Sequence, residues 1–95
     1  MTRDELLNAL RDLKPWMESQ GLVNVRLFGS YARDEAGPAS DIDLLVDETH
    51  TLSVLDRFDV EEALGARLKR TVDVCFERNL NPYVRQTALR DALVV

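Results

Sequence analysis

Apolar residues recur at helical spacing in three segments of the chain. The first segment begins at Thr2, which opens a capping-box sequence, and we expect Pro15 to interrupt this helix or to start a second short turn. The second segment follows Ser53, a residue suited to capping a helix. The third begins at Asn81-Pro82, a pair typical of an N-cap and a first helical position.

Three shorter segments predict β-strands. Each either alternates apolar and polar residues or is continuously apolar, and they are rich in β-branched residues. They cover residues 23–28, 41–46 and 71–76. Between the first two strands, residues 29–40 contain a glycine-proline breaker and predict a loop, with room for one helical turn. The order α-β-β-α-β-α indicates the α/β (α+β) class, with helices packed on a small mixed β-sheet. Because the chain has 95 residues, we expect a single domain over residues 1–95.

The charge and cysteine content narrow the classes of partner. The formal net charge is −5 and the pI is about 4.7, which argues against a direct nucleic-acid partner and favours a basic partner or a cation site. Cys75 is the single cysteine, so no intrachain disulfide can form, as is usual in a reducing cytoplasm. The start of the chain is unlike a signal peptide, and no apolar run has membrane-spanning length. We therefore expect a cytoplasmic protein with no membrane partner.

Carboxylates gather at the starts of two predicted strands. Asp41 and Asp43 are one residue apart, so strand alternation places them on one face, opposite the apolar residues of the same strand. In the next strand Asp73 also takes the face opposite the core. If the two strands are neighbours, three carboxylates converge, and their repulsion must be relieved by a raised pKa or by a divalent cation. Mg²⁺ is suited to such a site, and a pair of ions can hold both oxygens of an in-line displacement.

A Gly-Ser pair lies just upstream of these carboxylates, directly after the first predicted strand. Gly29 permits close approach of the backbone to a ligand, and Ser30 offers a hydroxyl and an amide. Together they predict a phosphate site that faces the metal site. Arg33 has two interpretations: it contacts phosphate, or it pairs with Asp34 or Glu35 at the surface.

The spacing of these residues resembles a known family. Gly29-Ser30, ten residues and then Asp41-x-Asp43 is similar to the GS-x10-DxD signature of the nucleotidyltransferase superfamily related to DNA polymerase beta. The segment FGSYAR at residues 28–33 resembles its smallest members, the minimal nucleotidyltransferase (MNT) proteins. Many of those are antitoxins paired with HEPN-domain ribonuclease toxins. The resemblance implies Mg²⁺-dependent transfer of AMP from ATP to a tyrosine of such a toxin.

The resemblance also implies a role for each matching residue. The ATP triphosphate would be held by Gly29 and Ser30, with Arg33 as a further candidate. The catalytic and metal-binding carboxylates would be Asp41, Asp43 and Asp73, the last of which would also help to activate the acceptor hydroxyl.

One position departs from the family pattern, because Asp34 stands where glycine is common. This extra carboxylate either weakens nucleotide binding or faces solvent. Tyr31 adjoins the phosphate site, so it is either a site of self-modification or a residue that packs the loop.

Two other functions remain open at this point. One is a non-catalytic antitoxin that binds and masks its toxin. The other is a nucleotidyltransferase that acts on a small molecule or on RNA, which the short chain disfavours because it leaves no second domain to hold such a substrate.

Overall fold

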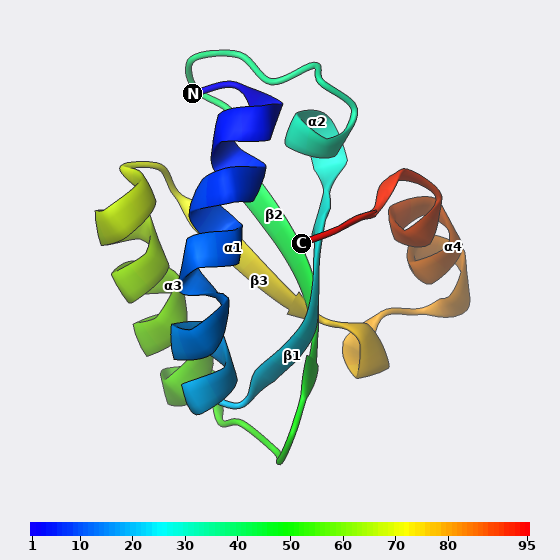
Figure 1. Ribbon diagram of the computed structural model, residues 1–95. Coiled ribbons are helices and arrows are strands. Elements are labelled where there is room, and N and C mark those ends of the chain that lie inside the picture. The colour runs from blue at the N-terminus through cyan, green and yellow to red at the C-terminus, as the bar shows by residue number, and fades with distance from the viewer.

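The computed structural model describes residues 1–95, which form a four-stranded mixed sheet with helices packed on it (Figure 1). The strands are β1 (Leu22–Phe28), β2 (Ile42–Glu48), β3 (Val72–Phe76) and β4 (Leu93–Val94). The helices are α1 (Arg3–Ser19), α2 (Gly29–Ala32), α3 (Val54–Leu68) and α4 (Pro82–Asp91), with a 3-10 turn η1 (Glu77–Asn79). The order across the sheet is β3-β2-β1-β4, with β2 and β3 parallel and the other pairs antiparallel. The predicted fold class is confirmed, and α2, η1 and β4 are added to the predicted order.

Side-chain caps fix the starts of the three long helices as predicted. The Thr2 hydroxyl accepts the Glu5 N–H at 3.1 Å, and the Glu5 carboxylate accepts the Thr2 N–H at 2.9 Å. Ser53 and Asp56 form the same reciprocal pair at α3. Asn81 caps α4 through its side-chain oxygen. Each cap satisfies amides that have no partner within the helix.

The prediction at Pro15 is wrong, because α1 continues through it to Ser19. Proline removes one backbone hydrogen bond and crowds the preceding turn. The apolar face of α1 stays buried on both sides of the proline, from Leu6 to Met17, and packing of that face supplies most of the stability of such a helix. Tertiary packing therefore outweighs the local preference of proline.

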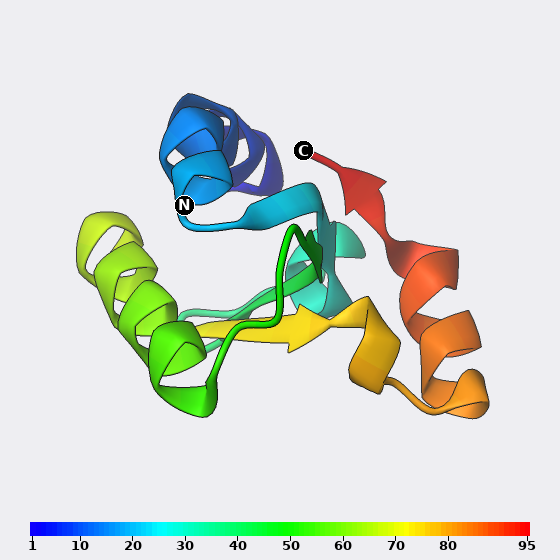
Figure 2. The same cartoon turned by 90° about the horizontal axis from the view of Figure 1, so that it is seen from below.

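The main core lies between one face of the sheet and the pair α1 and α3, which cover that face together (Figures 1 and 2). Alternate strand residues face this core, as the pattern predicted. From β2 and β3 they are Ile42, Leu44, Val46, Val72, Val74 and Phe76. None of the helices combines the length and the apolar character needed to cross a membrane.

The other side of the sheet carries polar groups that link it to α4. The Arg26 guanidinium lies 3.4 Å from Asp47 and 3.1 Å from Glu77, and its side chain is only 15% exposed. Glu77 also accepts a hydrogen bond from Arg85 of α4 at 3.0 Å. Asn24, at a bulge in β1 with a φ of 51°, donates to Asp47 at 2.8 Å. This network fixes where α4 begins relative to the sheet.

Candidate active site

The paired strands β2 and β3 bring two of the three predicted carboxylates side by side. Asp43 and Asp73 are direct partners in the parallel register, so their side chains leave the same face of the sheet. Asp41 was predicted to begin the second strand, but it lies just before β2, which begins at Ile42. The main-chain N–H of Ile42 donates to the carbonyl of Thr71 at 2.9 Å, which holds the starts of the two strands together.

Asp43 is at the centre of this cluster. Burial raises the pKa of its carboxyl group, and the charges of Asp73 and Asp41 raise it further. Arg33 opposes the shift, but its influence is the smallest of the four. The ionised form of Asp43 is therefore disfavoured, because it is partly removed from water and faces two like charges.

The three carboxylates Asp41, Asp43 and Asp73 are the candidate ligands for a divalent cation. No three His, Cys, Asp or Glu side chains in the chain are close enough together to form a ready-made metal-binding group. Nevertheless, Asp41 and Asp73 are near enough to act on the pKa of Asp43. Mg²⁺ prefers oxygen ligands, and its charge would offset the repulsion among these carboxylates. The chemistry of the three side chains is therefore compatible with this ion.

The Gly29 backbone lies against Asp43. Gly29 follows β1 directly, begins the short helix α2 and has a φ of 75°, a conformation that residues with a side chain rarely adopt. A Cβ built on Gly29 would overlap Asp43 Oδ2, well inside van der Waals contact. Glycine is therefore required here both by the backbone angle and by the space beside the carboxylate. Ser30 comes next in α2 and is partly exposed.

Arg33 lies next to this site but is already bound to two carboxylates. Its guanidinium is 3.1 Å from Glu35 and 3.2 Å from Asp91 of α4, and its side chain is 43% exposed. Both partners raise the pKa of the guanidinium. The predicted surface pair with Glu35 is confirmed, whereas the pair with Asp91 was missed.

The environment of Tyr31 favours packing over modification. Its side chain is 3% exposed and belongs to the main core. A tyrosine in this position cannot present its hydroxyl to a bound nucleotide without leaving the core. The structure therefore supports the prediction that Tyr31 packs the loop.

Asp34 has a φ of 59°, in the left-handed region, and it is exposed to solvent. Aspartate is among the few residues that tolerate this region, and glycine adopts it freely. We expect Asp34→Ala to lower the free energy of unfolding by about 1 kcal/mol and Asp34→Gly to be tolerated. Urea unfolding of both variants would measure this difference. Equal losses in the two variants would mean that the backbone angle does not set the preference.

Three hollows border the site residues, and none was predicted. One holds about 400 Å³ and is lined by Asp41 together with Ser40, Lys69 and Thr71. Of the other two, the first holds about 250 Å³ between the end of β1 and α4. Its lining combines site residues with an exposed face of α4: Phe28, Gly29, Arg33, Tyr83, Val84, Thr87, Ala88 and Asp91. The second holds about 620 Å³ between α3 and β3, and Asp73 is at its edge. The solvent-exposed Tyr83 was the available signal for the first hollow, since a large exposed aromatic side chain often marks a binding surface.

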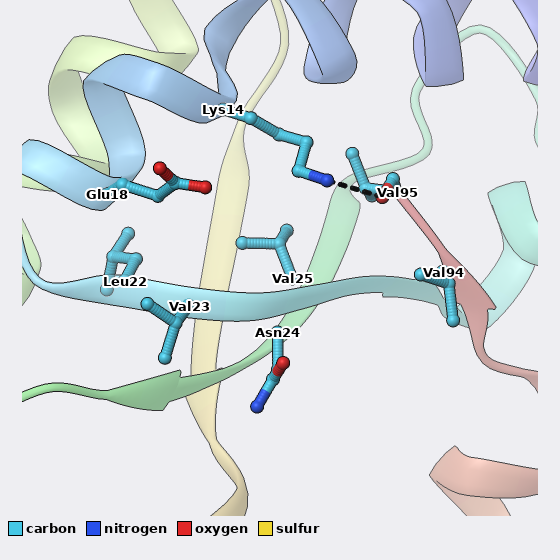
Figure 3. Close-up of a pocket in the computed structure, with 8 residues that line it drawn as sticks. All are labelled: Lys14, Glu18, Leu22, Val23, Asn24, Val25, Val94 and Val95. Atoms are coloured by element: carbon cyan, nitrogen blue, oxygen red, sulfur yellow. Dashed lines mark hydrogen bonds between the residues drawn. The ribbon is translucent and has the colours of Figure 1, made fainter.

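Another pocket, of about 220 Å³, lies away from these residues (Figure 3). It is bounded by α1, the first half of β1 and the C-terminal residues. Lys14 donates to the Val95 carbonyl oxygen across it at 3.2 Å. Gly29 is at the opposite end of β1, and this pocket contains none of the predicted site residues.

Comparison with known proteins gives consistent matches. A family model described as a nucleotidyltransferase domain matches residues 3–95. The chain is 37% identical over 82 residues to the protein adenylyltransferase MntA of Thermococcus cleftensis, covering 86% of this chain and 83% of that protein. A solved structure described as a candidate minimal nucleotidyltransferase is 36% identical, with a TM-score of 0.87, and the match covers 100% of this chain and 97% of the other.

A further similar structure is described as a tri-AMPylated HEPN toxin of Shewanella oneidensis in complex with an MNT antitoxin. It is 25% identical, with a TM-score of 0.63, and the match covers 97% of this chain and 66% of the other. Because the family match runs over residues 3–95, it includes the three carboxylates and Gly29. This chain therefore belongs to the nucleotidyltransferase domain family of enzymes.

Proposed function

We propose that this enzyme is a single-domain antitoxin that transfers AMP from ATP to a tyrosine of a HEPN-domain toxin and thereby neutralises the toxin. The observation that carries the proposal is the register pair of Asp43 and Asp73 beside the Gly29 backbone. The similarity to an MNT antitoxin bound to an AMPylated HEPN toxin supports this class of acceptor. The similarity to a protein adenylyltransferase supports transfer to protein.

In this proposal the triphosphate lies along the start of α2. Gly29 lets the phosphates approach the main chain beside Asp43, and Ser30 supplies a hydroxyl and an amide as donors. Arg33 lines the same hollow as Gly29, and in this proposal its guanidinium turns toward a phosphate. That rotation exchanges its bonds to Glu35 and Asp91 for bonds to an anion of higher charge.

The proposed reaction is a displacement at the α-phosphorus of ATP. The tyrosine oxygen forms a bond to this phosphorus, the bond to the bridging oxygen of the β-phosphate breaks, and pyrophosphate leaves. In this proposal Asp73 accepts the proton of the tyrosine hydroxyl. Three carboxylates, those of Asp41, Asp43 and Asp73, would hold Mg²⁺, with two ions at full occupancy. The charge of these ions would offset the charge that develops on the phosphate oxygens.

Intact mass of the partner toxin tests this proposal. The proposed HEPN-domain partner toxin would be co-expressed with the wild-type enzyme or with Asp41→Asn/Asp43→Asn. We expect the wild-type enzyme to add AMP to the toxin and the variant to add none, because the variant loses two of three clustered carboxylates. Asp12→Asn/Asp59→Asn, which changes two exposed carboxylates elsewhere, is the matched control and should behave as the wild type.

The same experiment separates catalysis from masking. If the toxin carries no AMP with the wild-type enzyme, and Asp41→Asn/Asp43→Asn still permits cell growth, the protein acts by binding alone. If the control variant also loses transfer, the effect is not specific to the carboxylate cluster.

A further inference from the structure

Two of the three hollows beside the carboxylates lie on either side of Asp43 and differ in which site residues they contain. Gly29 and Arg33 line the hollow beside α4, whereas Asp73 lines the groove between α3 and β3. Asp43 lies between them, because it contacts the Gly29 position on one side and pairs with Asp73 on the other. A displacement needs the entering and leaving groups on opposite sides of the phosphorus. The hollow beside α4 and the groove beside α3, on either side of Asp43, meet that requirement.

The groove beside α3 is acidic. Four of its eight lining residues are charged, and three of these are carboxylates: Glu61, Glu62 and Asp73. The one cation, Arg70, donates to the carbonyl of Lys69 at 3.0 Å. Such a surface repels a nucleotide triphosphate and attracts a cationic partner.

One wall of the groove is the free edge of the sheet. β3 is an outer strand, since the order is β3-β2-β1-β4. The Val74 N–H on this edge donates to Glu61 at 2.8 Å, which blocks strand addition at that point. The edge next to Thr71 and Val72 lines the groove, so an extended segment could lie along it up to Asp73.

The other wall continues into an exposed apolar surface. Leu55, Phe58 and Glu62 are three and four residues apart on α3 and share one helix face. Leu55 is 75% exposed and Phe58 is 62% exposed. Large apolar side chains exposed beside a polar groove are typical of a protein–protein contact.

We infer that the groove between α3 and β3 receives the segment of the partner toxin that carries the acceptor hydroxyl, and that its carboxylates select a segment with a basic residue beside that hydroxyl. Phe58 and Leu55 then contact an apolar residue further along the same segment. This inference rests on the proposed function, since it names the binding surface for the acceptor of that reaction.

Charge reversal at Glu62 tests the inference. Glu62 is exposed and forms no ion pair in the chain, so Glu62→Lys should fold normally. We expect it to raise the KM for the partner toxin by about tenfold and to leave the KM for ATP unchanged. Glu62→Gln should give a smaller rise. Glu18→Lys makes the same charge change at an exposed position of α1, and it should leave the KM for the toxin and the KM for ATP unchanged.

Steady-state AMP transfer to the purified toxin, followed by mass spectrometry, gives both constants. An unchanged KM for the toxin in Glu62→Lys would overturn the inference while leaving the proposed function intact. A change in the KM for ATP alone would also overturn it, because the groove would then belong to the nucleotide. Failure of the wild-type enzyme to transfer AMP would overturn the proposed function and this inference with it.

Discussion

Asp43→Asn is expected to reduce the proposed AMP transfer by about 10²–10³-fold and at the same time to raise the Tm of the Mg²⁺-free protein at neutral pH. The loss of activity follows because Asp43 is the central carboxylate of the site, and removing one preorganised electrostatic group typically reduces the rate by about 10²–10³-fold. The gain in stability follows because ionised Asp43 is partly buried and faces Asp41 and Asp73. A neutral amide of the same shape removes that repulsion.

The pH dependence of stability independently tests whether Asp43→Asn raises or lowers the Tm. The folded-state pKa of Asp43 is raised, so its stabilising contribution is present at low pH and is lost as the pH rises through that value. The Tm of Asp43→Asn should therefore fall less than the Tm of the wild type as the pH rises through the pKa of Asp43. Mg²⁺ should raise the Tm of the wild-type protein more than that of the variant, since ligand binding stabilises the folded state.

Asp47 offers a matched control on the same strand. Its pKa is lowered, first by the hydrogen bond from Asn24, so its contribution is present above the unfolded pKa and lost as the pH falls. Asp47→Asn should therefore lower the Tm at neutral pH, the opposite of Asp43→Asn. Thermal unfolding between acidic and neutral pH would compare the two variants. A lower Tm in both would mean that repulsion at Asp43 is not significant in the folded protein.

Gly29→Ala is expected to lower AMP transfer by about 10²-fold, because a misplacement of about 1 Å at a reacting centre is enough for such a loss. Two effects act together: an alanine at a φ of 75° loses about 1–2 kcal/mol, and its Cβ would overlap Asp43 Oδ2. The variant must therefore move either α2 or the Asp43 side chain. Urea unfolding and transfer kinetics would measure both consequences.

Gly37→Ala is the control for this variant. A Cβ at Gly37 would meet no atom within 4 Å, and its φ lies outside the left-handed region. We expect stability to be unchanged or slightly higher, because alanine restricts the unfolded chain. If Gly29→Ala were as stable and as active as Gly37→Ala, the contact between the Gly29 backbone and Asp43 would not matter.

Local chemistry made much of the fold predictable. The starts of the long helices could be read from Thr2, Ser53 and Asn81, because a cap depends on residues within one turn. The short strand β4 could not be read, because two residues carry no periodicity and their pairing depends on the distant edge of β1. The prediction at Pro15 was wrong for a related reason, because the burial of the apolar face of α1 outweighs the local helix-breaking effect of proline.

The same distinction applies to the site. The pairing of Asp43 with Asp73 followed from strand alternation, given that β2 and β3 are neighbours. The ion pair between Arg33 and Asp91 joins residues 58 positions apart, and no local pattern indicates it. The hollow beside α4 was missed for this reason, because it exists only where α4 returns to the end of β1.

The position of β4 also affects how the sheet is completed during synthesis. Folding on the ribosome proceeds from the N-terminus, yet Arg26 and Leu27 of β1 pair with Val94 and Leu93. This edge of β1 therefore stays open until β4 has been made, and an open edge can pair with another chain. Closing such a long loop slows folding, so the nascent protein depends on β4, which follows β1 by more than sixty residues, to complete the sheet.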